Sequence, residues 1–341
     1  MAAPTLSSVS PNQGPSSGGT TVTLTGTGFT GATAVRFGTT AAASFIVTSS
    51  TQITAVTPPG TGAVNVTVTT SQGTSTQTVT YTYVTAPVLS SLAPTQGPTA
   101  GGTTVTLTGT NLTGATAVSF DATAATSFTV NSPTQITAVA PAHAAGAAAV
   151  TVTTPGGTSN PDNPVAYFFY ATAPSATNIA PSSGTVAGGT TVILTGSGFI
   201  NATAVRFDAT AATSFTVNSP SQITAVTPAH AAGAAAVTVT TPGGTSNALD
   251  YFYLAAPTLT SLTPSQGPAS GGSVIALTGT NLTTTTSVLF GGTPATFTVL
   301  SPTQVTALPP AGAAGAVTVT VATAAGVSNG LTYTRIAAPA I

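Results

Sequence analysis

The residues that decide the fold are SPNQGPSSGGTTVTLTG, at positions 10–26. The same phrase returns with small changes at 93–109, 180–196 and 263–279, at spacings of 83, 87 and 83 residues. Its first half is rich in Pro, Gly and Ser, which is typical of turns. Its second half alternates Thr with Val22 and Leu24, which predicts a strand with one buried face. We therefore predict four tandem repeats.

Several short strands are predicted to follow this phrase in each repeat. In the first repeat they are expected around 35–37, 44–47 and 52–56, before a hairpin of 63–70 and 76–83 with Gly73 in its turn. The first strand ends at a turn whose third residue is always Gly or Asn, the two residues that best tolerate positive φ. These residues are Gly28, Asn111, Gly198 and Asn281. About seven strands without a helical pattern predict an antiparallel two-sheet sandwich.

The repeats are predicted to follow one another without a flexible linker. The joints are three or four residues long and contain a Pro, as in Val84-Thr85-Ala86-Pro87, which leaves little freedom. The sequence thus predicts an elongated rod, in which four extra residues of the second repeat (161–164) form a loop. The predicted bounds are 1–84, 85–171, 172–254 and 255–335 for the repeats, and 336–341 for a C-terminal tail.

The composition limits the classes of partner. Charged residues make up 2% of the chain, and the net charge is −1, so little repulsion keeps copies apart and we expect self-association. Three Lys and Arg residues in total cannot neutralise a row of phosphates, so nucleic acid is not an expected partner. No apolar run approaches the roughly 20 residues that span a bilayer. With no Cys, no disulfide or thiolate metal site is expected.

The repeated motifs resemble the IPT/TIG family of immunoglobulin-like domains. The resemblance rests on P-x-x-G-P, G-G-T-x-V-T-[IL]-x-G, V-x-F, T-x-I-x-[AC]-x-x-P and V-x-V-x-x-x-x-G, which recur in all four repeats. The third repeat departs at Gly184-Thr185, where the usual Pro is missing, and a looser loop is expected there. The resemblance implies an immunoglobulin-like β-sandwich. Family members occur in cell-surface receptors, transcription factors, bacterial surface proteins and polysaccharide enzymes, so it implies the fold more than the function.

Few residues have the chemistry of a site. His143 and His230 lie in identical PAHAAG loops in a chain that has no Cys and no Glu, with Asp only elsewhere, and a loop or inter-repeat contact is expected for them. Asp121 and Asp208 stand where the first and fourth repeats have Gly, which predicts a turn-forming role instead of a carboxylate role. We therefore expect no catalytic residue, no metal site and no cofactor, and the chain is predicted not to be an enzyme.

Two further charged groups have ordinary interpretations. Arg206 and Asp208 flank Phe207, so an outward-facing ion pair is expected, which is worth roughly 0–1 kcal/mol. Asp162 lies between two prolines but lacks the pattern of a calcium loop. A plain loop is the expected structure there.

Aromatic residues gather in the last strand of each repeat. One hypothesis is a contact surface that stacks on sugars, formed by Tyr167, Tyr170, Tyr251 and Tyr253. The alternative is that one face of each strand fills the core and the other packs where repeats meet. The absence of Trp favours this alternative.

The leading functional hypothesis is a bacterial extracellular or cell-surface protein, a fibre or stalk subunit that binds copies of itself. Its tail, with Arg335, Ile336, Pro339 and Ile341, resembles the opening strand of a further repeat and is a candidate self-association segment. The alternatives are a carbohydrate-binding or adhesive module with surface glycans as partners, and a phage-tail or injection-machine accessory protein. The start Met1-Ala2-Ala3-Pro4 shows no signal-peptide pattern, so the export route stays open.

Overall fold

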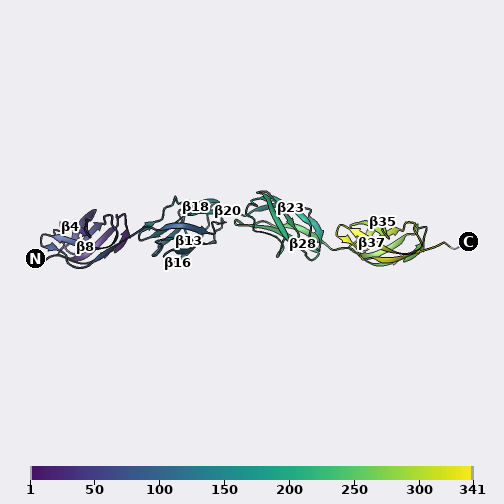
Figure 1. The fold of residues 1–341 in the computed structure, drawn as a ribbon, viewed down its shortest axis with the longest axis horizontal. Coiled ribbons are helices and arrows are strands. Elements are labelled where there is room, and N and C mark those ends of the chain that lie inside the picture. Colours follow the sequence, from purple (N-terminus) through teal and green to yellow (C-terminus); the bar gives the residue numbers. More distant parts are fainter. Residues whose placement is uncertain (1, 339–341) are drawn as a thin grey trace. The chain divides into compact units, whose positions relative to one another are not determined.

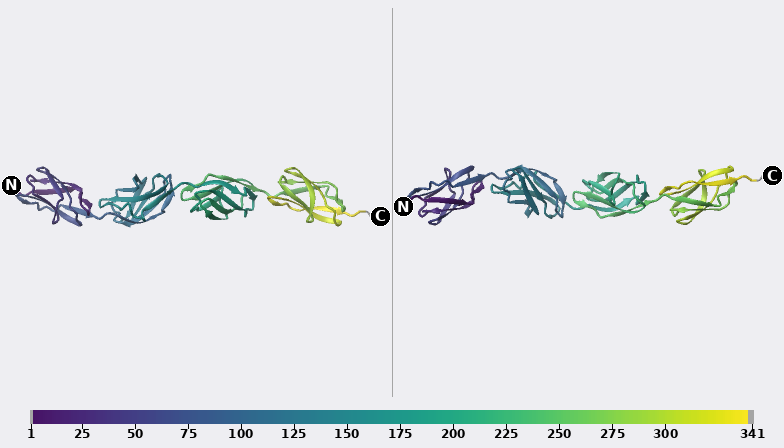
Figure 2. Two further views of the ribbon diagram at one scale, coloured as in Figure 1. Left: turned by 90° about the horizontal axis from the view of Figure 1, so that it is seen from above. Right: turned by 90° about the horizontal axis from the view of Figure 1, so that it is seen from below.

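The computed structural model describes residues 2–338, and all of its regular elements are β-strands. The described residues contain no helix that could cross a membrane. The chain divides into two compact units, Met1–Thr172 and Ala173–Ile341. Each unit contains two of the predicted repeats, drawn in Figure 1 as separate sandwiches and in Figure 2 from two further sides.

The first repeat forms two sheets that face each other across one core. One sheet has the order β1-β3-β7-β6, and the other has the order β2-β10-β8-β4-β5 with β9 also paired to β8. The bounds are β1 Thr5–Ser10, β2 Gln13–Pro15, β3 Thr21–Thr27, β4 Ala34–Phe37, β5 Thr40–Ala41, β6 Ser44–Ser49, β7 Gln52–Val56, β8 Gly62–Thr70, β9 Gly73–Thr74 and β10 Thr80–Val84.

The second and third repeats reproduce these sheets strand by strand. The second contains β11 Val88–Ala93, β12 Gln96–Pro98, β13 Thr104–Thr110, β14 Ala117–Phe120, β15 Thr123–Ala124, β16 Ser127–Ser132, β17 Gln135–Val139, β18 Gly146–Thr154, β19 Gly157–Thr158 and β20 Tyr167–Ala171. The third contains β21 Ser175–Ala180, β22 Ser183–Thr185, β23 Thr191–Ser197, β24 Ala204–Phe207, β25 Thr210–Ala211, β26 Ser214–Ser219, β27 Gln222–Val226, β28 Gly233–Thr241, β29 Gly244–Thr245 and β30 Leu249–Leu254.

In the fourth repeat one long strand joins the two sheets. The strand β35 pairs with β34 through its first residues and with β36 through the rest, so the repeat forms one nine-stranded sheet. The strands are β31 Thr258–Thr263, β32 Gln266–Pro268, β33 Ile275–Thr280, β34 Thr285–Phe290, β35 Thr293–Ser301, β36 Gln304–Leu308, β37 Gly315–Thr323, β38 Gly326–Val327 and β39 Leu331–Ile336.

The predicted all-β sandwich is confirmed, and the structure adds short strands that the sequence pattern did not reveal. The stretch interpreted as a turn contains β2, which pairs in parallel with β10. The predicted hairpin strand 76–83 is shorter than expected, because only its residues from Thr80 onward belong to β10 and pair with β8, while residues 75–79 between β9 and β10 are not in a strand. Side chains bridge the gap: the Val68 N–H donates to the Ser75 hydroxyl and the Val79 N–H to the Asn65 amide oxygen.

Alternation along the strands produces the cores. In β3, Val22 and Leu24 are fully buried while Thr21 and Thr25 are exposed. Phe37 of β4 and Tyr81 of β10 close the other side of this core, with ring centroids 5.3 Å apart in an edge-to-face arrangement. Edge-to-face packing adds about 0.5–1.5 kcal/mol beyond the area that the rings bury. Each repeat has its own cluster of this kind.

The turn predictions also hold. The residues that end the first long strand have positive φ, with values of 71° at Gly28, 58° at Asn111, 73° at Gly198 and 58° at Asn281. The third repeat, which lacks the usual Pro, still forms β22, and Ser183 and Thr185 pair with β30 in the register seen in the other repeats. The looser loop expected there is therefore not found.

Candidate functional site

The two aspartates that replace glycine occupy a left-handed turn. The φ angles are 50° at Asp121 and 51° at Asp208, close to the 61° of Gly38 and the 60° of Gly291. Aspartate is among the few residues that tolerate this conformation, because its short side chain bonds locally. The predicted turn-forming role is confirmed.

The carboxylates nevertheless have partners, which corrects the sequence interpretation. Asp121 Oδ1 accepts a hydrogen bond of 2.7 Å from the Ala149 N–H, and its Oδ2 lies 3.3 Å from His143 Nε2. In the third repeat the matching distances are 2.8 Å from the Ala236 N–H to Asp208 Oδ1, and 3.2 Å from His230 Nε2 to Asp208 Oδ2. The fold brings together an Asp and a His that are 22 residues apart in sequence, which is why their spacing gave no signal.

Each histidine contacts its own repeat on three sides. His143 stacks on Tyr170 with ring centroids 4.8 Å apart and planes 24° apart, and its Nδ1 lies 2.9 Å from the Ala144 carbonyl oxygen. His230 stacks on Tyr253 in the same way, with ring centroids 4.7 Å apart and planes 22° apart. Oxygen atoms of the same repeat therefore lie within hydrogen-bonding distance of both ring nitrogens of each histidine. Among the described residues no group of three or more His, Asp or Glu side chains is placed to hold a metal ion.

The Asp and the His are both replaced by Gly in the first and fourth repeats. His143 and His230 stand at the position that Gly60 and Gly312 occupy in the first and fourth repeats. The backbone N–H of all four residues donates to the carbonyl oxygen of an equivalent residue in its own repeat. Where the turn residue is Asp the loop residue is His, and where the turn residue is Gly the loop residue is also Gly. We call each set of Asp, His and Tyr the Asp–His–Tyr cluster. Its members are Asp121, His143 and Tyr170 in the second repeat, and Asp208, His230 and Tyr253 in the third.

The tyrosines predicted as a contact surface are mostly core residues. Tyr170, Tyr251 and Tyr253 are buried, and Tyr167 is half-buried. Burial, with a smaller contribution from the Asp121 charge, raises the pKa of Tyr170 to about 12. Their rings fill the sandwich interior because every second residue of the last strand points inward. The alternative that the sequence favoured, a core face, is the correct one for these three tyrosines.

The opposite face of the same strand presents exposed aromatic residues that sequence reasoning missed. Phe169 is 52% exposed and Phe252 is 48% exposed. They occupy one register position, opposite Ala147 and Ala234 of the neighbouring strand. The alternation of the last strand contained the signal, because the residue next to a buried aromatic must face outward.

The arginines do not pair as predicted. Arg206 donates from Nη1 to the Ala209 carbonyl oxygen at 2.8 Å, and Arg36 does the same to Thr39 at 2.8 Å. Asp208 instead faces His230, so the expected Arg206–Asp208 pair is wrong. Asp162 lies in a loop that Asn163 fastens to the strand β11, because Asn163 Nδ2 donates to the Leu89 carbonyl oxygen.

The C-terminal residues divide between strand and tail. Arg335 and Ile336 belong to β39, where Arg335 pairs with Gly315 and Gly267, so the fourth repeat extends one residue beyond its predicted end. Arg335 is buried and donates to the Pro310 carbonyl oxygen at 3.1 Å, while Ile336 is 47% exposed. Arg335 therefore belongs to the strand and not to a free segment. Pro339 and Ile341 lie outside the described residues.

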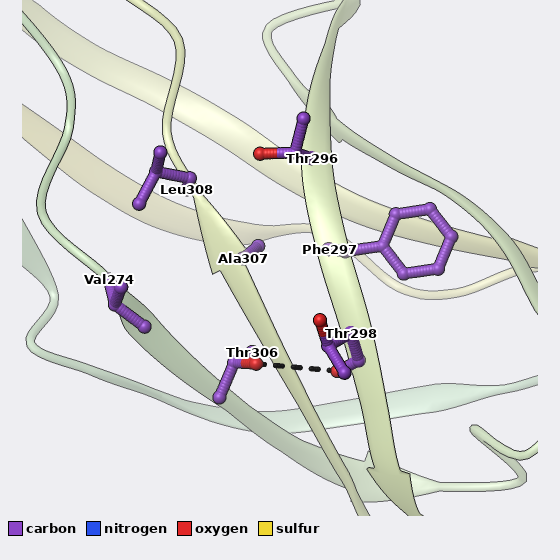
Figure 3. A pocket seen from close by; sticks show the side chains of 7 residues that line it. All are labelled: Val274, Thr296, Phe297, Thr298, Thr306, Ala307 and Leu308. Carbon is purple, nitrogen blue, oxygen red and sulfur yellow. Dashed lines mark hydrogen bonds between the residues drawn. The ribbon is translucent and has the colours of Figure 1, made fainter.

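A shallow hollow lies on the outer face of the fourth repeat. Its volume is about 210 Å³, and a hydrogen bond from the Thr306 hydroxyl to the Thr298 carbonyl oxygen crosses it (Figure 3). It is lined by Val274, Thr296, Phe297, Thr298, Thr306, Ala307 and Leu308, and the Phe297 ring points away from Thr306 and Leu308 (Figure 3). None of the described residues that line it is titratable, and their side chains offer apolar contact and hydroxyl hydrogen bonds.

Four sandwiches with separate cores define a tandem-repeat protein of the immunoglobulin-like class. The family model described as "IPT/TIG domain" matches residues 4–83, 87–167, 174–253 and 257–334. The chain belongs to the IPT/TIG domain family. None of the curated proteins compared with the chain matches it.

Several solved structures resemble the chain at low identity. The extracellular region of plexin A4 matches at 22% identity and a TM-score of 0.38, over 95% of this chain and 30% of that one. Invasin, a bacterial integrin-binding protein, matches at 18% identity and a TM-score of 0.31, over 97% of this chain and 79% of the invasin chain. A protein of the mixed-linkage glucan utilization locus of Bacteroides ovatus, in complex with a heptasaccharide, matches at 18% identity and a TM-score of 0.24. The match covers 74% of this chain and 70% of that one. The chain thus spans less than a third of the plexin chain.

Proposed function

We propose that this chain is a non-catalytic structural protein of the bacterial cell surface, and that its copies associate into a fibre or stalk. The observation that supports the proposal is the nearly uncharged surface. The whole sequence has three Lys and Arg and four Asp and Glu. Arg335 is buried, and two of the aspartates are engaged with histidines. Copies of such a surface meet with little repulsion.

The remaining surface suits contact with another protein. Thr, Ser and Ala occupy most exposed strand positions, and a few large apolar side chains are exposed among them, such as Ile46 at 69% and Leu300 at 57%. Membership of the IPT/TIG family is consistent with this function, because family members occur in surface proteins. The elongated rod that the short joints predict belongs to the same proposal.

Negative-stain electron microscopy and sedimentation velocity of the purified full chain at physiological salt test this function. We expect filaments, or oligomers that grow with protein concentration. Cell fractionation with protease shaving tests the surface location. Particles that stay single at all concentrations would argue against association, and protection of the chain in intact cells would argue against the surface.

A carbohydrate-binding or adhesive module is the second candidate, and Phe169 with Phe252 is the observation that favours it. Each of the two repeats presents one exposed aromatic ring at the same register position, and a flat ring of this kind suits the apolar face of a sugar. A glycan screen of the full chain tests it. We expect any binding to weaken at least tenfold in the Phe169→Ala, Phe252→Ala double variant, and to be unchanged in a control with exposed Ile193→Ala and Ile200→Ala.

A further inference from the structure

The four-stranded sheet of each of the first three repeats ends in a strand with one unpaired edge. The strands at the other end, β1, β11 and β21, also pair on one side only, but side-chain amides bond their backbone at Leu6, Leu89 and Ala176. Within residues 2–338, the strands β6, β16 and β26 pair only with β7, β17 and β27 respectively. In the fourth repeat, residues 296–301 of β35 likewise pair only with β36. We call these four segments the free edges. Their outward N–H and C=O groups are the kind that another extended strand can bind.

The free edges lack the features that usually prevent strand addition. Their sequences are SFIVTS, SFTVNS, SFTVNS and TFTVLS, without a charged residue or a Pro. Each is regular over its first four residues and shifts register only beside the hairpin that follows, as between Val47 and Ser49. A Lys on an edge strand is the common device against edge-to-edge pairing, and this chain has none.

Exposed side chains accompany the free edges. Ile46 of β6 is 69% exposed, and Leu300 of β35 is 57% exposed. The positions that correspond to Ile46 are Thr129, Thr216 and Thr298, and all three are exposed. Thr and Ile favour strands because their branched side chains pack well on a pleated surface. A strand added at these edges would pack its outward-facing side chains beside these Ile and Thr side chains.

We propose that copies of this chain bind one another by pairing free edge against free edge. This inference rests on the self-association proposed above and names the surface that performs it. A second copy is the occupant for two reasons. An unpaired edge needs an extended, uncharged strand, and the free edges defined above supply four of them in each copy. Several weak pairings within one pair of chains also reinforce one another, because the first raises the effective concentration of the rest.

The test adds one Lys to each free edge of the full chain, as Ile46→Lys, Thr129→Lys, Thr216→Lys and Thr298→Lys together. A matched control adds the same charge to the opposite edge of the same sheets, as Ser8→Lys, Ser91→Lys, Asn178→Lys and Ser261→Lys, all at exposed positions. Circular dichroism checks that both variants keep their strands, and sedimentation velocity measures association.

We expect the free-edge variant to need at least tenfold more protein than the unmodified chain to associate, while the control behaves like the unmodified chain. Equal loss in both variants would show that added charge alone disperses the protein, which overturns the inference. Unchanged association of the free-edge variant also overturns it. An unmodified chain that never associates instead removes the proposed function itself, so the two failures are distinguishable.

Discussion

Replacing Phe168 with alanine should destabilise the second repeat by about 3–5 kcal/mol, the usual cost of truncating a buried Phe. The ring is fully buried. It packs edge-to-face on Phe120 at 5.5 Å and on Tyr170 at 4.9 Å, so its loss leaves a cavity between the sheets and removes two aromatic contacts. The neighbouring strands cannot close the gap without breaking their ladder hydrogen bonds.

The adjacent residue supplies a matched control. Phe169→Ala removes the same side chain from the outer face of the same strand, where the ring is 52% exposed, and exposed substitutions of this kind usually stay within about 0.5 kcal/mol. Hydrogen exchange of the full chain, followed in peptides from β18 and β20, reports the second repeat separately. Similar loss of protection in both variants would mean that the inner and outer faces of β20 are wrongly assigned.

Alternation and repeat length were sufficient to predict the fold. The period-two pattern of Val22 and Leu24, repeated in three more copies, leaves only a half-buried strand in a sandwich. The short strands were missed for a physical reason. The strand β2 is three residues long and lies within a turn-rich phrase, so its pairing with β10 depends on the tertiary fold and not on local preference.

The candidate site was much less predictable. The replacement of Asp121 by Gly in other repeats correctly indicated a turn, but the same argument wrongly dismissed its carboxylate. A contact between Asp121 and His143 arises only when the turn after β14 and the loop before β18 meet at one end of the sandwich. Sequence spacing cannot report that contact. The joint exchange of both residues with Gly in the first and fourth repeats was present in the sequence and is the signal that points to a pair.

Asp121→Ala should cost the second repeat about 2–3 kcal/mol. Alanine in a left-handed conformation is disfavoured by about 1–2 kcal/mol, and the Ala149 N–H loses an acceptor, which adds about 1 kcal/mol. Asp121→Gly removes the backbone strain but not the lost hydrogen bond, so we expect it to cost less than half as much. Urea denaturation of the full chain with hydrogen exchange in β14 and β18 measures both. Equal costs for the two variants would mean that the positive φ of 50° at Asp121 carries no penalty.

A double-mutant cycle measures the coupling energy of the Asp–His contact. It compares Asp121→Gly, His143→Gly and the double variant with the unmodified chain, and Gly is the residue that the first and fourth repeats have, at Gly60 and Gly312. The Asp121 carboxylate is 44% exposed and the His143 side chain 21% exposed, so solvent screens the pair and we expect a coupling energy of only about 0.3–1 kcal/mol. A positive coupling would explain why Gly replaces both residues together: once one partner is absent, the other stabilises less. Strictly additive costs would instead mean that turn and loop vary independently, with the stacking of His143 on Tyr170 as the main contribution of the histidine. The double variant has Gly at both positions, as the first repeat does at Gly38 and Gly60, so it should also remain folded, and the coupling energy can then be measured without loss of the sandwich.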